Sequence, residues 1–224
     1  MEGKPSVLKI VCAVGGAIIL GGLVWLTLSS TREVQAPTTT TSLLTVAPDD
    51  YSEGTTTASV TLVEYLDFEC EACGAYFPLV KQLEQEFPND LRVVRRYFPL
   101  PGHKNGMTAA LAVEAAARQS KYTEMHDLLF TEQEKWGEKN TSTPAVFEDY
   151  AKQLGLDMEK FKQDVASPEV AARVQRDIDS GKKLGNSGTP TFFLNGEKIQ
   201  NPQGYEPFKA LIKAKVSTSA PVNQ

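Results

Sequence analysis

Two cysteines at a spacing of three are the residues of this chain best suited to chemistry. Cys70 and Cys73 enclose Glu-Ala, follow the apolar, β-branched run Val60–Leu66 and precede the amphipathic run Ala75–Phe87. Two sulfurs three residues apart on a helix lie on one face, within reach of a disulfide. A thiol at a helix N-terminus also meets unpaired N–H groups and the positive end of the helix dipole, which favour its thiolate. We therefore predict a redox-active pair in which Cys70, nearer the helix start, is the nucleophile and Cys73 is the leaving group.

A static structural disulfide and a zinc site are two other uses of such a pair. Closing so short a loop removes little entropy from the unfolded chain, so a disulfide here would stabilise the fold weakly. Zinc would need two further ligands, and the two histidines, His103 and His126, stand at no recognised spacing from the cysteines. We expect no metal and no cofactor at the pair, and we interpret both histidines as polar helix or loop residues.

Three carboxylates lie close to the cysteines in the sequence. Glu64 alternates with leucines on one face of the predicted buried strand, where a carboxyl is costly unless used and burial raises its pKa towards neutrality. The alternative is a partly exposed glutamate near the strand edge. Glu71, inside the motif, sets a negative charge beside the thiolate and should raise the pKa of Cys70. Glu69 is expected to be a solvated carboxylate that also bears on that pKa.

Further motifs point to a known family. Pro78 lies inside the helix that follows Cys73, where it removes one hydrogen bond and bends the helix. Thr189-Pro190 lies in a loop before a short buried strand and an Asn-Gly turn. Together with the cysteine pair and Glu64, six residues before Cys70, these features resemble the membrane-anchored DsbA-like thiol:disulfide oxidoreductases of the thioredoxin superfamily. Weaker similarities are Phe98-Pro99-Leu100, Glu124-Met125-His126-Asp127 and Gly204.

The resemblance implies roles for these residues. A cis Thr189–Pro190 bond would present the Thr189 backbone beside Cys70, where an extended substrate peptide can add as a strand. Glu64 would act as a proton shuttle to Cys73. The cysteine pair would exchange its disulfide with dithiols of exported proteins through a mixed disulfide, as an oxidant. Because the chain carries one such pair, a membrane partner, a quinone-linked thiol oxidoreductase in similar proteins, would reoxidise it.

Other functions of the same site remain open. The dipeptide Glu71-Ala72 departs from the Pro-His pair of the most oxidising family members, so we expect redox tuning towards a weaker oxidant. A disulfide isomerase or reductase with the same dithiol is the close alternative. A non-catalytic metal-binding module, such as a metallochaperone, is the alternative from another class.

The N-terminal residues predict a membrane anchor. Ile10 to Leu28 is an uncharged apolar run, preceded by Lys4 and Lys9 and followed by Arg32. At ~1.5 Å per residue such a helix spans about 30 Å of hydrocarbon. We expect residues 1–30 to form a single uncleaved transmembrane helix with its N-terminus in the cytoplasm and the catalytic domain outside it. A cleaved signal peptide, whose apolar core is normally ~7–15 residues, is the alternative.

The rest of the chain predicts an α/β thioredoxin fold with an inserted helical subdomain. A flexible Thr/Ser-rich linker over 31–42 leads into a domain over 43–218, with the helical insertion at about 105–183 and a tail over 219–224. The predicted strands are Leu43–Val46 at an edge, Val60–Leu66, Leu91–Tyr97 and the hairpin Thr191–Leu194 with Glu197–Gln200. The predicted helices beyond the cysteines are Met107–Ser120, Tyr122–Trp136, Pro144–Leu154, Asp157–Val165, Pro168–Lys182 and Tyr205–Val216. Asp49 to Ser59 is expected to be turn and loop.

The net charge of the chain disfavours some classes of binding partner. Its formal net charge is −5 and its pI is near 5.2. A surface of that sign is a poor match for nucleic acid or for an anionic membrane surface. We therefore expect no nucleic acid among the partners of this protein.

Overall fold

The protein is built around a five-stranded mixed sheet. The structure, a computed structural model, describes residues 39–139, 141 and 143–219. The strands are β1 (Tyr51–Glu53), β2 (Val60–Leu66), β3 (Leu91–Tyr97), β4 (Thr191–Leu194) and β5 (Glu197–Lys198). Their spatial order is β1-β3-β2-β4-β5, in which β2 and β3 are parallel and the other neighbours are antiparallel. β2 therefore lies at the centre, and its C-terminal end leads directly into the cysteine motif.

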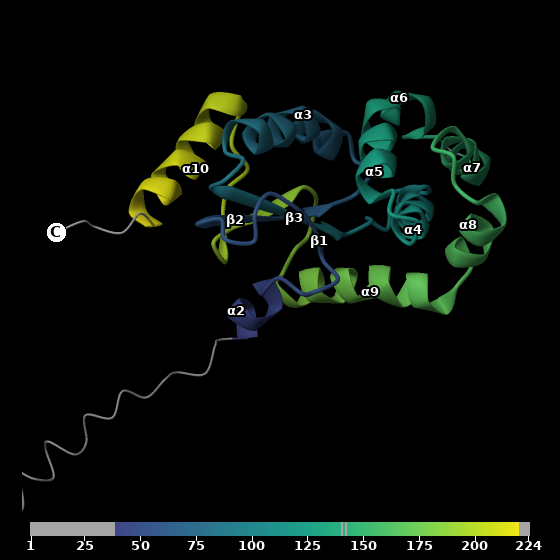
Figure 1. Cartoon of the computed structure of the whole chain (residues 1–224), viewed down its shortest axis with the longest axis horizontal. Helices are drawn as coiled ribbons and strands as arrows, with labels where there is room; N and C mark the ends of the chain where they lie inside the picture. The colour runs from purple at the N-terminus through teal and green to yellow at the C-terminus, as the bar shows by residue number, and fades with distance from the viewer. Residues whose placement is uncertain (1–38, 140, 142, 220–224) are drawn as a thin grey trace, which may run out of the picture. The chain divides into compact units, whose positions relative to one another are not determined.

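Helices cover both faces of this sheet (Figure 1). One face carries α3 (Glu71–Glu86) and α10 (Tyr205–Ser219), and the other carries α9 (Pro168–Lys183) and the short α2 (Thr39–Leu44). Successive side chains of a strand point to opposite faces, so β2 divides its residues between two cores. Leu62 packs with Val80 and Phe208 on the first side, and Val63 packs with Leu44 on the second. Burial on both faces explains why β2 is apolar at almost every position.

The cysteine motif forms the first turn of α3. The helix begins at Glu71, earlier than the predicted start at Ala75, and Cys70 is its N-cap residue. The Gly74 N–H donates to the Cys70 carbonyl at 3.1 Å, which closes the first helical turn around the motif. Pro78 lies inside the helix, which continues past it as predicted.

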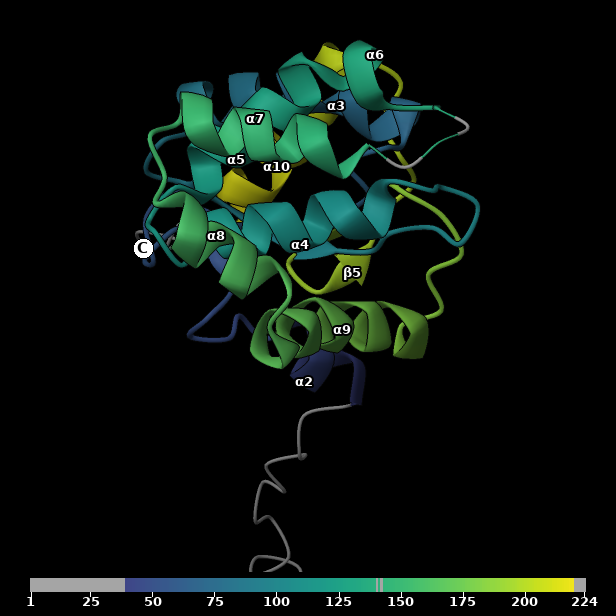
Figure 2. The same ribbon diagram turned by 90° about the vertical axis from the view of Figure 1, so that its right-hand side faces the viewer.

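The helical insert lies between β3 and β4 in the sequence (Figure 2). It comprises α4 (Gly106–Ala117), α5 (Tyr122–Thr131), α6 (Gln133–Trp136), α7 (Pro144–Gln153), α8 (Met158–Val165) and α9. Trp136, Phe147 and Phe161 are each at most 1% exposed and form part of the core of the insert. The predicted helix Tyr122–Trp136 is divided into α5 and α6, with Glu132 between them.

The first edge strand is not where the sequence predicted it. Leu43–Val46 is not a strand, because Leu43 and Leu44 end α2, and the edge strand β1 lies within the segment expected to be turn and loop. Tyr51 in β1 stacks on Tyr122 with ring centroids 3.9 Å apart. That partner lies in the insert, so the local pattern contained no sign of it. The hairpin strand β5 also ends at Lys198, earlier than predicted.

The N-terminal predictions fall mostly outside the described residues. The apolar run Ile10–Leu28, the linker up to residue 38 and the last residues of the tail belong to that part of the chain. The end of the predicted linker, residues 39–42, is helical. Within residues 39–219, apart from 140 and 142, no helix combines the length and apolarity that crossing a membrane requires.

Candidate active site

The two cysteines are reduced and lie at the meeting point of β2, α3 and the loop before β4. Cys70 is 8% exposed and Cys73 is fully buried. The Cys70 N–H donates to the Asp67 carbonyl at 3.1 Å. On the opposite side, the Gln133 side chain from α6 donates to the carbonyls of Phe68 and Cys70 at 2.7 and 2.9 Å. The insert therefore holds the backbone on which the outer sulfur is mounted.

The surroundings of Cys70 favour its thiolate. A hydrogen bond from the Cys73 thiol, against the opposing effect of burial, lowers the pKa of Cys70 to about 5. The Thr189 hydroxyl and the backbone N–H groups of Cys73 and Ala72 lower it further. These donors outweigh the repulsion expected from Glu71, whose side chain is exposed. A thiol with this pKa is largely ionised at neutral pH, which is the reactive form.

Cys73 shows the opposite behaviour. Burial raises its pKa well above the ordinary value, and the negative charges of Cys70 and Glu64 raise it further. The Asp67 N–H, at 3.5 Å from the Cys73 sulfur, works against this rise. In the reduced protein the inner sulfur therefore keeps its proton while the outer sulfur gives its proton up.

Glu64 lies in the central strand with its carboxyl buried. It is 4% exposed, and it stands opposite Arg95 of β3 and Phe192 of β4 in the sheet. Burial raises the pKa of Glu64 to about 7, although the positive charge of Arg95 opposes the rise. The alternative of a partly exposed glutamate near the strand edge is wrong, because β2 is the central strand, paired with β3 on one side and with β4 on the other. A carboxyl with a pKa near 7 can both bind and release a proton at physiological pH.

The Thr189–Pro190 bond is cis, as expected, and lies against the outer sulfur. The Cys70 sulfur is 3.3 Å from the Thr189 carbonyl oxygen. Asn201 donates to the Pro190 carbonyl at 2.8 Å and fixes the loop from its other end. The hydroxyl oxygen of Thr189 is buried and has no hydrogen-bond partner among the described residues. The loop thus holds its backbone beside the nucleophile.

Several residues of the site were missed by sequence reasoning. Glu69 is 2% exposed, so the prediction of a solvated carboxylate is wrong, and it accepts a 2.6 Å hydrogen bond from the Asn105 N–H. His126 lies in a helix, as interpreted, and is buried among aromatic rings that include Phe68 and Phe130. Gln133 and His103 approach the motif from the insert and from the loop before it. Because these contacts join segments far apart in the sequence, no local pattern could have indicated them.

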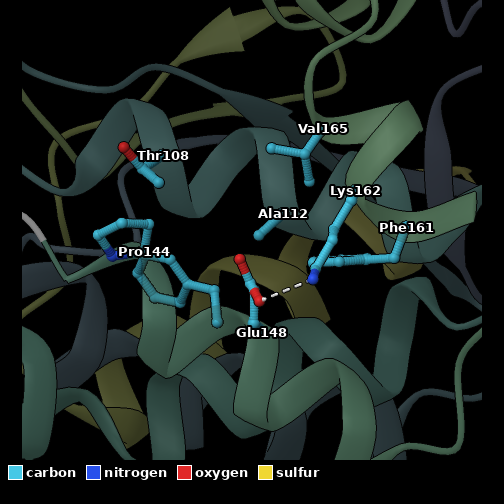
Figure 3. A pocket seen from close by; sticks show the side chains of 8 residues that line it. Thr108, Ala112, Pro144, Glu148, Phe161, Lys162 and Val165 are labelled. Atoms are coloured by element: carbon cyan, nitrogen blue, oxygen red, sulfur yellow. Dashed lines mark ion pairs between the residues drawn. The ribbon is translucent and has the colours of Figure 1, made fainter. Parts of the chain in front are cut away.

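A cavity in the helical insert lies apart from the cysteine pair. Across the part of the chain that the structure describes, no three His, Cys, Asp or Glu side chains gather as a metal site would require. A cavity of about 180 Å³ lies between α4, α7 and α8 (Figure 3). Phe147, Phe161 and Val165 line it, and an ion pair between Glu148 and Lys162 at 3.7 Å borders it.

Known proteins share the architecture that carries this site. The model of a family described as thioredoxin matches residues 47–214. A segment of the Na(+)/H(+) antiporter NhaA 3 of Salinispora tropica is 38% identical over 172 residues, covering 76% of this chain and 25% of that protein. An NhaA of Herminiimonas arsenicoxydans shows the same identity over 165 residues. The chain spans about a quarter of the length of these curated relatives.

Solved structures extend the comparison. A thioredoxin-like oxidoreductase of Silicibacter pomeroyi is 27% identical with a TM-score of 0.64, over 77% of this chain and 93% of that one. Oxidised BdbD of Bacillus subtilis is 25% identical with a TM-score of 0.67, over 75% and 93%. The α-DsbA1 of Wolbachia pipientis has a TM-score of 0.73 over 81% and 98%, and its 20% identity shows likeness of fold alone. These matches include the helical insert as well as the sheet.

Proposed function

We propose that this chain, which belongs to the thioredoxin family and has a DsbA-like fold, is a thiol:disulfide oxidoreductase. Its proposed reaction is the oxidation of dithiols in exported proteins. The observation that carries the proposal is the contrast between its two sulfurs. The pKa of Cys70 lies at about 5, while the pKa of Cys73 lies well above its ordinary value. One sulfur is therefore a good leaving group, and the other holds its proton in the reduced protein.

The reaction starts from the disulfide form of the pair. A client thiolate attacks the Cys70 sulfur, a new bond joins the two, and the Cys70–Cys73 bond breaks. Cys73 leaves as a thiolate and takes up a proton, and the donor we propose is Glu64, a buried carboxyl with a pKa of about 7 whose charge acts on Cys73.

The second step completes the transfer. The second thiolate of the client attacks the client sulfur of the mixed disulfide, and Cys70 departs as a thiolate. Two electrons have then passed from the client dithiol to the pair. Because a low pKa makes Cys70 a favourable leaving group, the exchange favours the oxidised client. The cis Thr189–Pro190 loop supports this step, since an extended client segment can pair with the Thr189 backbone beside the sulfur.

Location and reoxidation are proposals that rest on the resemblance to DsbA-like proteins. The apolar run Ile10–Leu28 favours a single-pass anchor in the cell membrane, with the redox domain on the extracytoplasmic side. A membrane-bound, quinone-linked thiol oxidoreductase would restore the disulfide after each cycle. The chain itself supplies one Cys-x-x-Cys pair for this exchange.

The reduction potential of the pair tests the proposal. We expect equilibration with glutathione buffers to show a pair that is oxidising relative to glutathione, and the disulfide form to accelerate refolding of reduced ribonuclease. A pair that reduces insulin efficiently and fails to oxidise ribonuclease would instead identify a reductase, and activity on scrambled ribonuclease an isomerase. Retention of zinc or copper without any disulfide exchange would identify a metal-binding module.

A further inference from the structure

His103 lies in the loop between β3 and α4 and is bonded to a buried carboxylate next to the cysteines. Its Nδ1 is 2.6 Å from Oδ2 of Asp67, and its side chain is 22% exposed, whereas that of Asp67 is completely buried. Asp67 also accepts hydrogen bonds from the backbone N–H groups of Leu100 at 2.7 Å and Glu69 at 2.9 Å. Such a set of donors fixes the carboxylate and therefore the imidazole ring that it holds.

Asp67 is in contact with both cysteines through its backbone. Its carbonyl accepts the Cys70 N–H at 3.1 Å, and its N–H donates to the Cys73 sulfur at 3.5 Å. The backbone of Asp67 therefore links the Asp67–His103 pair to both cysteines of the redox centre. The motif itself carries Glu71 and Ala72 between its cysteines, so it contains no basic side chain of its own.

The charges around His103 favour its protonated form. Partial burial lowers the pKa of His103, but the Asp67 carboxylate raises it, and the Cys70 thiolate and Glu69 add to the rise, so the net shift is upward. The groups that face the ring are thus Asp67 and Glu69 from the loop after β2 and Cys70 at the start of α3. Lys104 follows His103 in its own loop, with its side chain exposed. Since the interaction between two charges is reciprocal, an imidazolium at this place also stabilises the Cys70 thiolate.

We propose that His103, held by Asp67, supplies from a neighbouring loop the positive charge that the Cys-Glu-Ala-Cys motif lacks. It acts as a positioning residue of the redox centre, because it works on Cys70 through charge and through Asp67 rather than by contact with the client. Its protonation makes the pair a stronger oxidant, and its removal leaves the Asp67 carboxylate uncompensated near the thiolate. This inference rests on the proposed function only where it refers to the potential of the pair.

The test uses the full chain with His103→Gln, His103→Lys and, as a matched control in the same loop, Lys104→Gln. The first readout is the absorbance of the Cys70 thiolate as a function of pH in the reduced protein. The second is the equilibrium with glutathione. We expect His103→Gln to raise the pKa of Cys70 by roughly half a unit, which is about threefold less thiolate below that pKa. The glutathione equilibrium should move about threefold towards the oxidised protein, or about 14 mV at ~30 mV per tenfold.

The other variants separate charge at this site from charge in general. His103→Lys should keep the pKa of Cys70 low and abolish any change in potential that follows titration of the imidazole. Lys104→Gln should leave the pKa of Cys70 within about 0.2 units of the wild-type value, since its exposed charge is screened by solvent. An unchanged Cys70 titration in His103→Gln, or an equal shift in Lys104→Gln, overturns the inference.

Two further outcomes are distinguishable. If His103→Gln does not fold, as judged by circular dichroism, His103→Lys carries the test, and loss of the low Cys70 pKa in that variant overturns the inference. If the wild-type protein exchanges no disulfide with glutathione, the proposed function fails. The thiolate titration of Cys70 still decides the role of His103 in that case.

Discussion

The mouth and the floor of the site differ in chemistry although one helix supplies both. The mouth consists of Cys70 with the Thr189–Pro190 loop, and the floor consists of Cys73 with Glu64. Both sulfurs lie in the first turn of α3 and meet the same helix dipole, yet the pKa of Cys70 falls to about 5 and that of Cys73 rises. Depth and local donors therefore outweigh the dipole, whose effect is typically ~0.3–1 kcal/mol.

The largest expected effects come from substitutions that remove either sulfur. Cys70→Ser should abolish disulfide exchange, with at least a ~1,000-fold loss, because no other thiolate replaces the nucleophile. Cys73→Ala should keep the nucleophile Cys70 but lack the inner thiol that releases a client from the mixed disulfide. Mixed disulfides with clients should therefore accumulate and be visible on non-reducing gels. The Cys70 pKa should also rise in Cys73→Ala, since its largest favourable contribution is lost. A Cys73→Ala protein that forms no adducts would contradict the division of roles.

Glu64→Gln should change the proton supply to Cys73 and leave the surroundings of Cys70 intact. We expect exchange to slow by roughly 100-fold, within the range for loss of a positioned acid or base. The folded protein holds a proton on Glu64 up to a pKa of about 7, whereas the ordinary value is 4.5. At Glu64 the folded state thus binds more protons than the unfolded state between these values, and the contribution of this group to stability falls as pH rises through the window, opposite in sign to that of the Cys70 thiol.

At ~1.4 kcal/mol per pKa unit, this effect amounts to about 3 kcal/mol above pH 8. Urea unfolding of the disulfide form, in which Cys70 carries no titrating thiol, should show a stability change from pH 5 to pH 8 that is more negative in the wild-type protein than in Glu64→Gln. Glu159→Gln, at an exposed position, is the matched control. An equal decline in Glu64→Gln and wild type would place the buried proton elsewhere.

Thr189→Val tests the surroundings of Cys70, because valine has nearly the shape of threonine and lacks its hydroxyl. The side chain of Thr189 lowers the pKa of Cys70 through its polar hydroxyl, which valine replaces by a methyl group. We expect the Cys70 pKa to rise by about one unit and the glutathione equilibrium to shift about tenfold towards the oxidised protein. Thr191→Val is the control, because the Thr191 hydroxyl donates to the Gly188 carbonyl instead. A shift of equal size in both variants would rule out the specific contact.

Gln133→Ala should have the smallest effect, on stability rather than on chemistry. It removes the hydrogen bonds that join α6 to the carbonyls of Phe68 and Cys70. We expect a loss of about 1–2 kcal/mol in the free energy of unfolding and little change in the Cys70 pKa. Gln175→Ala removes an exposed side-chain hydrogen bond to Asp179 and should cost less than ~0.5 kcal/mol. Equal losses in the two variants would show that the insert does not support the motif.

Local patterns were sufficient for the elements on which the site is built. The apolar run of β2 and the amphipathic pattern of α3 each describe a segment that buries its own residues, so the sequence predicted them and the motif between them. The same reasoning placed β1 wrongly, because its three residues, Tyr51–Glu53, are only half-buried and are held by a partner strand and by Tyr122. It also made Glu69 a solvated residue, since its partner Asn105 lies 36 positions away.

The sequence by itself determined that a strand ends in two cysteines at the start of a helix, because hydrophobic periodicity and the spacing of three are local properties. Only the tertiary structure decided how far the two sulfurs differ in pKa, since the core shared with the insert, the Thr189–Pro190 loop and the Asp67–His103 pair all come from distant segments. A pKa is set by everything within a few ångströms of the titrating atom. Neighbours in space, rather than neighbours in the chain, therefore decide which sulfur of this protein reacts.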